Sequence, residues 1–295
     1  MGQVNLKGMG VALITPFQTN GDVDYPALSR LVDYQLQSDT DFLVVLGTTA
    51  ETPTLSASEQ KKITQLVIEK AKNRVPIVLG VSGNNTRAVV ERLKTENMEG
   101  VDAILSVVPY YNKPSQEGIY QHYKAIAQAT SLPVILYNVP GRTGVNMTDE
   151  TTLRVAHDFK NVIAVKEASG NMTQIGSIIK NKPNNFQVIS GDDGITFPLI
   201  TFGAIGVISV IGNAFPKEFG QMVRTALSGN YDYALNLHHR FSELFELLFV
   251  DGSPAGIKSI LSMMGYIENE LRLPLVPARI STCEKIRTAL YDFEL

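Results

Sequence analysis

The chain has 295 residues, of which 44% are hydrophobic and 19% are charged, and its formal net charge is -3. These proportions are ordinary for a globular enzyme, and the slight acidic excess argues against a nucleic-acid-binding protein, which would carry a basic surface. The single cysteine, Cys283, excludes an intrachain disulfide and a cysteine-rich metal site.

Short apolar segments rich in Val, Ile and Leu recur along the chain, with helical patterns between them. Eight such segments span residues 10–16, 42–47, 76–81, 103–109, 133–140, 162–168, 186–192 and 206–212. Nearly all are continuous instead of alternating, which is typical of a parallel sheet whose outer face is covered. Strand–helix units of this number predict a (β/α)8 TIM barrel. An open doubly wound sheet is less favoured, because no Gly-x-Gly-x-x-Gly follows the first segment.

The segments between the predicted strands have helix signals of their own. Ser56-Ala57-Ser58-Glu59 has the spacing of a capping box, and Thr86 and Ser115 each precede an amphipathic stretch. After Pro216 the strand pattern stops, and helical patterns follow over residues 217–248, 256–267 and 281–293. We therefore predict a catalytic barrel over residues 1–224 and a C-terminal helical segment over residues 225–295. No flexible linker separates them, so the segment is not expected to fold alone.

Polar residues gather where the predicted strands end, which is where the active site of a TIM barrel lies. They are Gly47-Thr48-Thr49-Ala50-Glu51-Thr52, Pro109-Tyr110-Tyr111-Asn112, Tyr137-Asn138, Gly141-Arg142-Thr143-Gly144, Lys166-Glu167, Gly191-Asp192-Asp193 and Asn213.

Lys166 interrupts the apolar run Val162–Val165. Strand alternation places Val162, Ala164 and Lys166 on one face, and the small Ala164 indicates the crowded inner face of the barrel. A lysine held there would be partly desolvated, which favours the neutral amine that attacks a carbonyl to form a Schiff base. The alternative is a lysine that reaches solvent or pairs with Glu167. The tyrosines and threonines at neighbouring strand ends favour catalysis.

The other polar residues have two interpretations each. Tyr137 is either a core residue or a phenol that moves protons near Lys166. Thr48 and Thr49 either cap the next helix or bind a substrate carboxylate. Arg142 is either a solvated surface charge or a clamp for a carboxylate.

Several other kinds of protein are disfavoured. A metal-dependent aldolase needs clustered histidines and carboxylates, whereas none of the four histidines, His122, His157, His238 and His239, follows a predicted strand. Asp192-Asp193 would repel a phosphate. A keto-acid-binding protein without activity would have no need of Lys166 and Tyr137 together. No apolar run approaches the roughly 20 residues that span a bilayer, and residues 1–10 lack a signal-peptide pattern, so we expect no membrane partner.

Five motifs carry a resemblance to a known family. They are GTTAET (47–52), PYYNKPSQEG (109–118), YNVPGRTG (137–144), KEASGN (166–171) and SGDD (190–193). Their order and spacing resemble the dihydrodipicolinate synthase and N-acetylneuraminate lyase family of pyruvate-dependent class I aldolases, and its synthase branch most closely. The resemblance implies a Schiff base between Lys166 and pyruvate. It further implies a proton relay through Tyr137, Thr48 and Tyr111, with Tyr111 reaching a neighbouring subunit.

The resemblance also implies the binding residues and the partners. Thr48 and Thr49 would hold the pyruvate carboxylate, Gly191 and Ile208 would offer backbone groups, and Arg142 would receive the carboxylate of L-aspartate 4-semialdehyde. This is the condensation on the route to diaminopimelate and lysine. A lyase for N-acetylneuraminate or an aldolase for 2-keto-3-deoxy sugars is the alternative. No cofactor or metal is implied, and we expect a cytoplasmic homodimer or homotetramer built as a dimer of dimers.

Lysine inhibits some relatives at a site between subunits, through polar or histidine residues and a glutamate. The matching positions here are Pro53, Ala57, Gln60 and Ala88, although Asn84 and Tyr110 of that site remain. A cationic effector would lose hydrogen-bond partners and a counter-charge at these positions. We therefore expect weak or absent feedback by lysine.

Overall fold

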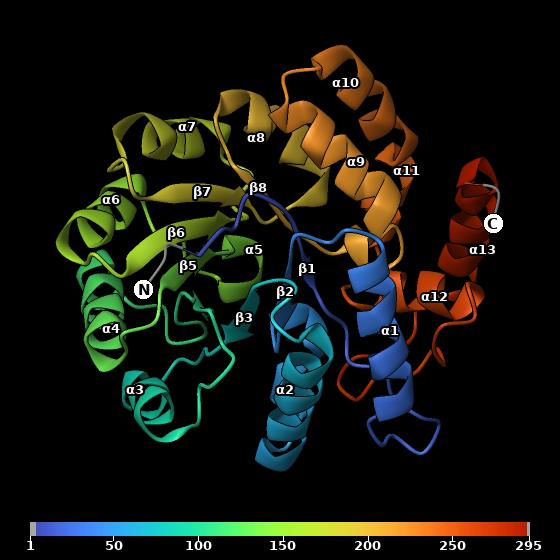
Figure 1. The fold of residues 1–295 in the computed structure, drawn as a ribbon, viewed down its shortest axis with the longest axis horizontal. Helices are drawn as coiled ribbons and strands as arrows, with labels where there is room; N and C mark the ends of the chain where they lie inside the picture. Colours follow the sequence, from blue (N-terminus) through green and yellow to red (C-terminus); the bar gives the residue numbers. More distant parts are fainter. Residues whose placement is uncertain (1–3, 294–295) are drawn as a thin grey trace.

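Eight parallel strands close into a barrel in sequence order, each joined to the next, with the last pairing with the first (Figure 1). The computed structural model describes residues 4–293. The strands are β1 (Gly8–Ala12), β2 (Phe42–Val45), β3 (Ile77–Gly80), β4 (Ala103–Val107), β5 (Val134–Asn138), β6 (Val162–Glu167), β7 (Gln187–Ser190) and β8 (Gly206–Ser209). The predicted TIM barrel is confirmed. The strands are shorter than the apolar runs, because each run continues into the loop at the end of its strand.

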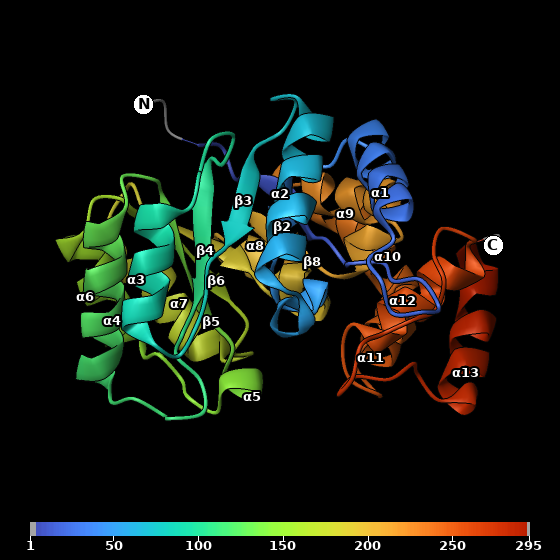
Figure 2. The ribbon, with the colours of Figure 1, turned by 90° about the horizontal axis from the view of Figure 1, so that it is seen from below.

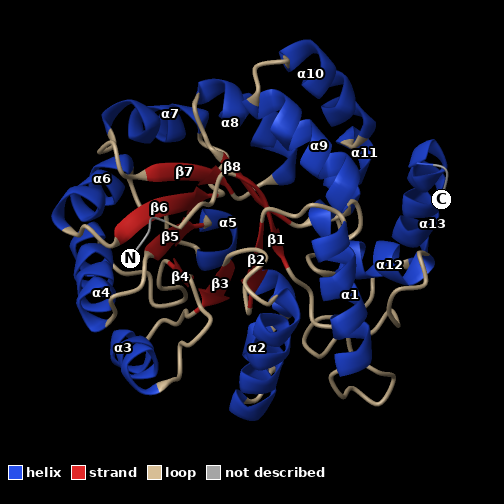
Figure 3. Cartoon of the chain, in the orientation of Figure 1, coloured by secondary structure: helices blue, strands red, loops and turns tan. Residues whose placement is uncertain are grey.

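Helices surround the barrel and cover its outer face (Figure 3). They are α1 (Tyr25–Gln37), α2 (Ala57–Ala71), α3 (Thr86–Thr95), α4 (Gln116–Ala129), α5 (Pro140–Thr143), α6 (Asp149–Asp158), α7 (Met172–Asn181), α8 (Thr196–Phe202), α9 (Pro216–Leu227), α10 (Tyr231–Arg240), α11 (Ser242–Leu247), α12 (Ala255–Met263) and α13 (Ile280–Leu290).

Two of the predicted helix starts are confirmed in detail. Ser56 and Glu59 form the capping box of α2, and the Ser115 side chain caps α4. At the third start, the N-cap of α3 is Asn85 instead of Thr86, which is the first helical residue. The helix expected after Thr86 therefore begins one residue earlier, at Thr86 itself. Asparagine serves as its cap because the Asn85 side chain accepts from free backbone N–H groups of the first turn.

The barrel has two apolar layers, one on each face of its strands. The layer outside the barrel packs against the helices and includes Val11, Leu79 and Val165. The layer inside the barrel includes Phe42 and Ile135, among other residues of every strand. Strand alternation separates the two layers, so a residue's position along its strand decides whether it faces the helices or the barrel interior.

One strand breaks this alternation, and the break corrects the prediction for β6. The pairing of β5 with β6 shifts register after Val134, which pairs with Val162, because Ile135 pairs with Ala164. Ile163 is therefore an extra residue in β6, as in a β-bulge. As a result Val162 lies in the outer layer, whereas Ile163 and Ala164 both border the inner one. The prediction was wrong for Val162 and confirmed for Ala164.

The C-terminal helices lie beside the barrel, beyond α1 (Figure 2). Helix α11 contacts the turn over residues 193–195, which follows β7, and α12 contacts the turn over residues 211–213, which follows β8. The segment therefore packs against the carboxyl ends of the strands. The predicted division after residue 224 stays a prediction, and helix α9 crosses it. Within residues 4–293, no helix combines the length and the apolar character that a membrane crossing requires.

Candidate active site

Lys166 and Tyr137 come together at the carboxyl ends of neighbouring strands. The two residues are paired in the register of β5 and β6. Both side chains are buried, each with an exposed fraction of only 5%, and the Lys166 Nζ lies 4.4 Å from the centre of the Tyr137 ring. Sequence alternation predicted that the Lys166 amine faces the mouth of the barrel, and this geometry places it beside the tyrosine on the inner face.

Glu167 lies on the opposite face of β6 and has partners of its own. The Asn138 Nδ2 donates to Glu167 Oε1 at 3.0 Å, and the Gln174 Nε2 donates to Oε2 at 3.3 Å. The backbone N–H of Ser169 donates to Oε1 as well. Burial raises the pKa of the Glu167 carboxyl above its usual value, against these hydrogen bonds. The carboxylate considered as a partner for Lys166 therefore braces β5, β6 and α7 instead.

Gly191 contacts Lys166 from the neighbouring strand. A Cβ at residue 191 would lie 3.0 Å from the Lys166 Cε and 2.8 Å from the Ala168 Cβ. Both distances are at or below the closest approach of real Cβ atoms, so only glycine fits here without a shift of its neighbours. The sequence alone did not predict that Gly191 packs against the Lys166 side chain.

The two threonines lie in a tight 3₁₀ turn over residues 48–50, directly after β2. Thr48 is exposed, whereas Thr49 is buried with an exposed fraction of 5%. The helix cap that one of them was expected to provide belongs to Ser56, which starts α2. Their hydroxyl groups are therefore not used as the caps of that helix.

A cavity of about 450 Å³ opens beside Thr48 and Tyr137. Thr48, Tyr137 and Arg142 all line it, which brings together three of the predicted site residues. Arg142 belongs to the short helix α5 and is exposed, and the helix ends at Gly144, whose φ is +70°. Cavities of this size hold small organic molecules, and the polar groups here suit a carboxylate.

Tyr111 is not brought into this cavity by its own chain. Its side chain has an exposed fraction of 87%, and its backbone is in the left-handed region with a φ of +72°. That conformation is uncommon for a tyrosine, and a large aromatic side chain left in water gains no burial energy. Tyr110, by contrast, lines the cavity.

Strands β7 and β8 pair with each other next to Gly191 and Ile208. The two strands share one registered pair, Ser190 with Val207, just before Gly191 and Ile208. Ile208 is fully buried in the inner layer of the barrel.

Farther along, the buried Asp193 accepts hydrogen bonds from the backbone N–H groups of Val210 and Ile211, at 3.0 and 2.8 Å. Burial raises the pKa of Asp193 to about 6.

One further group of charged residues was missed from the sequence. Glu51 follows the threonine turn and forms a fully buried ion pair with Lys258 of α12. The signal that could have found it is Lys258 itself, which interrupts the apolar run of residues 256–264, as Lys166 interrupts its own run. Among residues 4–293, no group of three or more His, Cys, Asp or Glu side chains is placed to hold a metal ion.

The chain is similar to known proteins over nearly its whole length. The model of the dihydrodipicolinate synthetase family matches residues 5–292. The 4-hydroxy-tetrahydrodipicolinate synthase of Parabacteroides distasonis is 73% identical over 295 residues, covering 100% of this chain and 99% of the relative. The enzyme of the same name from Phocaeicola vulgatus is 70% identical with the same coverage. The solved structure of dihydrodipicolinate synthase from Thermotoga maritima has a TM-score of 0.96 and 41% identity, with 100% of both chains covered.

Proposed function

The chain belongs to the dihydrodipicolinate synthetase family, and on that premise we propose that it is a class I lyase that condenses pyruvate with L-aspartate 4-semialdehyde through a Schiff base on Lys166. This is the reaction of a 4-hydroxy-tetrahydrodipicolinate synthase. The observation that carries the proposal is the buried Lys166 amine beside Tyr137, which itself lines a cavity together with Thr48 and Arg142.

The chemistry begins with attack of the Lys166 amine on the keto carbon of pyruvate. Loss of the carbonyl oxygen as water gives an imine, which acts as an electron sink. Removal of a proton from the pyruvate methyl group then gives an enamine, and its carbon attacks the aldehyde of the second substrate. The amino group of that substrate displaces Lys166 from the imine carbon, so the product leaves as a ring and the lysine is regenerated.

Each proton transfer needs a group beside the lysine. Tyr137 is close, since the centre of its ring lies 4.4 Å from the Lys166 Nζ. We assign proton relay to Tyr137, Thr48 and Tyr111, with Tyr111 supplied by a neighbouring subunit. The exposure of Tyr111 supports this assignment, because a partner would bury a ring that its own chain leaves in solvent. A homodimer or a dimer of dimers follows from this assignment.

Pyruvate also needs groups that hold its carboxylate. We assign this role to the backbone and hydroxyl groups of Thr48 and Thr49, which lie in a turn at the end of β2. Gly191 and Ile208 would offer backbone groups to the bound keto acid, and each directly follows a member of the registered pair of Ser190 with Val207. No metal ion or cofactor is needed in these steps, and the expected location is the cytoplasm.

Arg142 distinguishes the second substrate from its alternatives. Its guanidinium is exposed and borders the cavity, where it can bind the carboxylate of aspartate semialdehyde with two hydrogen bonds. A lyase for N-acetylneuraminate or a 2-keto-3-deoxy-sugar aldolase would share Lys166 and Tyr137 but would not need this cation.

An assay of the purified protein with pyruvate and either aspartate semialdehyde or sugar keto acids tests the proposal. We expect turnover with the semialdehyde alone. The variant Arg142→Gln should raise the KM for the semialdehyde roughly 10- to 100-fold, the usual value of charge-assisted hydrogen bonds. The KM for pyruvate should change much less. Turnover with sugar keto acids and none with the semialdehyde would favour the alternative lyases.

Feedback by lysine is expected to be weak. Pro53 and Gln60, two of the positions that match the effector site of related enzymes, line the cavity. The charged residues that line it are Arg92 and Arg142, with no carboxylate among the lining residues that the structure describes. Two cations disfavour a cationic effector. Full inhibition by submillimolar lysine in a steady-state assay would contradict this expectation.

A further inference from the structure

A fully buried ion pair joins the C-terminal segment to the threonine turn. The Lys258 Nζ of α12 lies 2.5 Å from the Glu51 Oε1, and neither side chain has any exposed surface. Lys258 also donates to the backbone carbonyl of Glu270 at 2.8 Å. Burial lowers the pKa of Lys258 to about 8, against the opposing effect of the Glu51 carboxylate, so the amine is mostly protonated at neutral pH.

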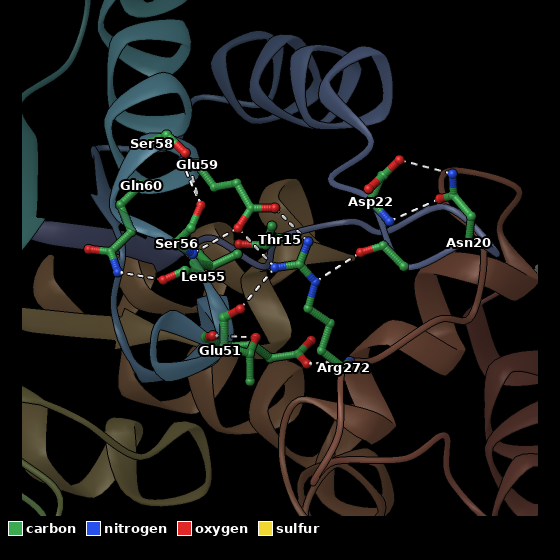
Figure 4. Close-up of polar contacts among 12 residues, drawn as sticks. Thr15, Asn20, Asp22, Glu51, Leu55, Ser56, Ser58, Glu59, Gln60 and Arg272 are labelled. Carbon is green, nitrogen blue, oxygen red and sulfur yellow. Dashed lines mark hydrogen bonds and ion pairs between the residues drawn. The ribbon is translucent and has the colours of Figure 1, made fainter.

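The second carboxylate oxygen of Glu51 is held by the same part of the chain. The backbone N–H of Arg272 donates to Glu51 Oε2 at 3.0 Å. The Arg272 guanidinium binds both oxygens of Glu59, as Figure 4 shows. It also donates to the Thr54 carbonyl at 2.9 Å. The Arg272 Nε also donates a hydrogen bond to the Gly21 carbonyl, at 2.9 Å. Arg272 therefore fixes the chain before α2, and Glu51 is held through both of its oxygens.

An aromatic ring lies between the barrel and these two cations. The Lys258 Nζ lies 4.2 Å and the Arg272 Cζ 4.6 Å from the centre of the Phe17 ring, which is itself buried. The electron-rich face of a ring attracts cations, most strongly when water is excluded. Phe17 therefore helps to keep Lys258 and Arg272 at the place where they meet Glu51.

Glu51 in turn fixes the position of the threonines. Its backbone N–H donates to the carbonyl of Thr48 at 3.2 Å and closes the turn that contains both threonines. Its φ of +55° lies in the left-handed region, which is uncommon for a glutamate and persists only where the surroundings hold it. On the other side of the turn, the Thr15 hydroxyl donates to the Ala50 carbonyl at 2.8 Å. A shift of Glu51 would therefore move Thr48 and Thr49.

We propose that Lys258 acts through Glu51 as a positioning residue for the threonine turn, so that the C-terminal segment sets how well the enzyme holds the pyruvate carboxylate. The inference rests on the proposed function, which gives Thr48 and Thr49 that role. Stability alone does not explain this ion pair, because apolar residues can often replace a buried ion pair without lowering the free energy of unfolding. A misplacement of about 1 Å at a site, by contrast, can cost a factor of about 100 in rate.

The double variant Glu51→Gln/Lys258→Met tests this inference. It removes both charges together, so no unpaired ion is left in the interior, and it keeps the size of both side chains. We expect a folded protein whose KM for pyruvate is raised about 10-fold or more. Lys166 should still be trapped by borohydride at saturating pyruvate, because its own surroundings are unchanged.

The single variant Glu51→Asp serves if the double variant does not fold. It keeps both charges of the buried pair but shortens the acidic side chain by one methylene group, so the turn must shift to keep its contacts, and a rise in the KM for pyruvate is expected again. Arg279→Ala is the matched control. It removes an ion pair with Asp251 in the same C-terminal segment, in which the arginine side chain is 69% exposed, and should leave the KM unchanged.

The outcomes separate this inference from the proposed function. A parent protein that forms the pyruvate adduct, together with a folded charge-free variant of parental KM, would overturn the positioning role alone. A purely structural role would lower the melting temperature of the variants and leave the KM of the folded fraction as it is. A parent without any pyruvate adduct would overturn the proposed function and this inference with it.

Discussion

Lys166 and Gly191 meet across β6 and β7, and a Cβ at residue 191 would lie 3.0 Å from the Lys166 Cε. The absence of a side chain at residue 191 leaves room for the methylene stem of the lysine. This contact lets the amine lie beside Tyr137 without a change in the strands. Gly191 therefore helps to position the Lys166 side chain by leaving space for it, although the glycine has no reactive group of its own.

The variant Gly191→Ala should displace the Lys166 side chain. Ala168 blocks the other direction, since its Cβ would be 2.8 Å from the new methyl group. We expect kcat/KM to fall about 100-fold, because a shift of the reacting amine by about 1 Å can have an effect of that size. Overpacking should also lower the free energy of unfolding by roughly 1–3 kcal/mol. Steady-state kinetics and urea unfolding measure the two effects.

Gly176→Ala is the control for this experiment. Gly176 lies inside α7, and a Cβ there would meet its nearest neighbour at 3.9 Å, an ordinary contact. Alanine is also the better helix former by roughly 1 kcal/mol. The control should keep full activity and at least parental stability. Equal kinetics for the two variants would mean that Gly191 does not position Lys166.

Tyr137→Phe should separate proton transfer from packing. The ring stays in contact with Lys166, whereas the hydroxyl that we assign to proton relay is lost. We expect kcat to fall roughly 10²- to 10⁴-fold, the usual contribution of a general acid or base. Tyr34→Phe is the matched control, because that partly buried hydroxyl donates to the Ala214 carbonyl and Tyr34 does not line the cavity. It should cost about 1 kcal/mol of stability and leave kcat unchanged.

Mixing two inactive variants tests whether Tyr111 is shared between subunits. Tyr111→Ala and Lys166→Ala should each be inactive alone. In a mixed dimer, one site combines Lys166 of the first variant with Tyr111 of the second and is complete. Equal amounts, after subunit exchange, should recover about a quarter of parental activity, since half of random dimers are mixed and each has one intact site. No recovery in verified mixed dimers would mean that Tyr111 does not act from a neighbouring subunit.

The contribution of Glu59 to stability should depend on pH in one direction. Its hydrogen bonds to Arg272 lower the pKa of Glu59 to about 2. The folded-state pKa is thus below the unfolded value of roughly 4.3, so the pair stabilises the protein fully above that pH and loses its effect as pH falls toward 2. Glu59→Gln should cost about 1 kcal/mol at pH 7, a value kept small because the pair is partly exposed.

Urea unfolding of the parent and Glu59→Gln, from pH 7 down to about pH 2, measures this effect. The difference between the two proteins should shrink as the pH is lowered. Glu117→Gln is the control, since Glu117 forms an ion pair with Arg154 in which both side chains are at least half exposed. A difference for Glu59→Gln that grows toward low pH would contradict the assigned partner.

Much of the fold could be predicted from the sequence, because the signals are local. A parallel strand in a barrel is covered on both faces, so each strand is a continuous apolar run, and all the predicted strands exist. The polar residues at the ends of these runs then indicate the site. Lys166 was found because an ammonium group is costly in an apolar run, and the structure brings it to Tyr137.

The errors arise where distant contacts decide the outcome. The extra residue at Ile163 reverses the face of Val162, and nothing in the run of aliphatic letters marks such a bulge. The contact of Gly191 with Lys166 depends on the packing of two strands. The pair between Glu51 and Lys258 joins residues 207 positions apart, so no local pattern contains both partners.

The measurement that tests the central claim most directly is peptide mapping after incubation with pyruvate and borohydride. Reduction converts the imine into a stable secondary amine, which marks the reacting lysine by mass. We predict one adduct per chain, located on Lys166 and absent from Lys166→Arg. No adduct in folded protein, or an adduct that persists on another lysine in Lys166→Arg, would contradict the account.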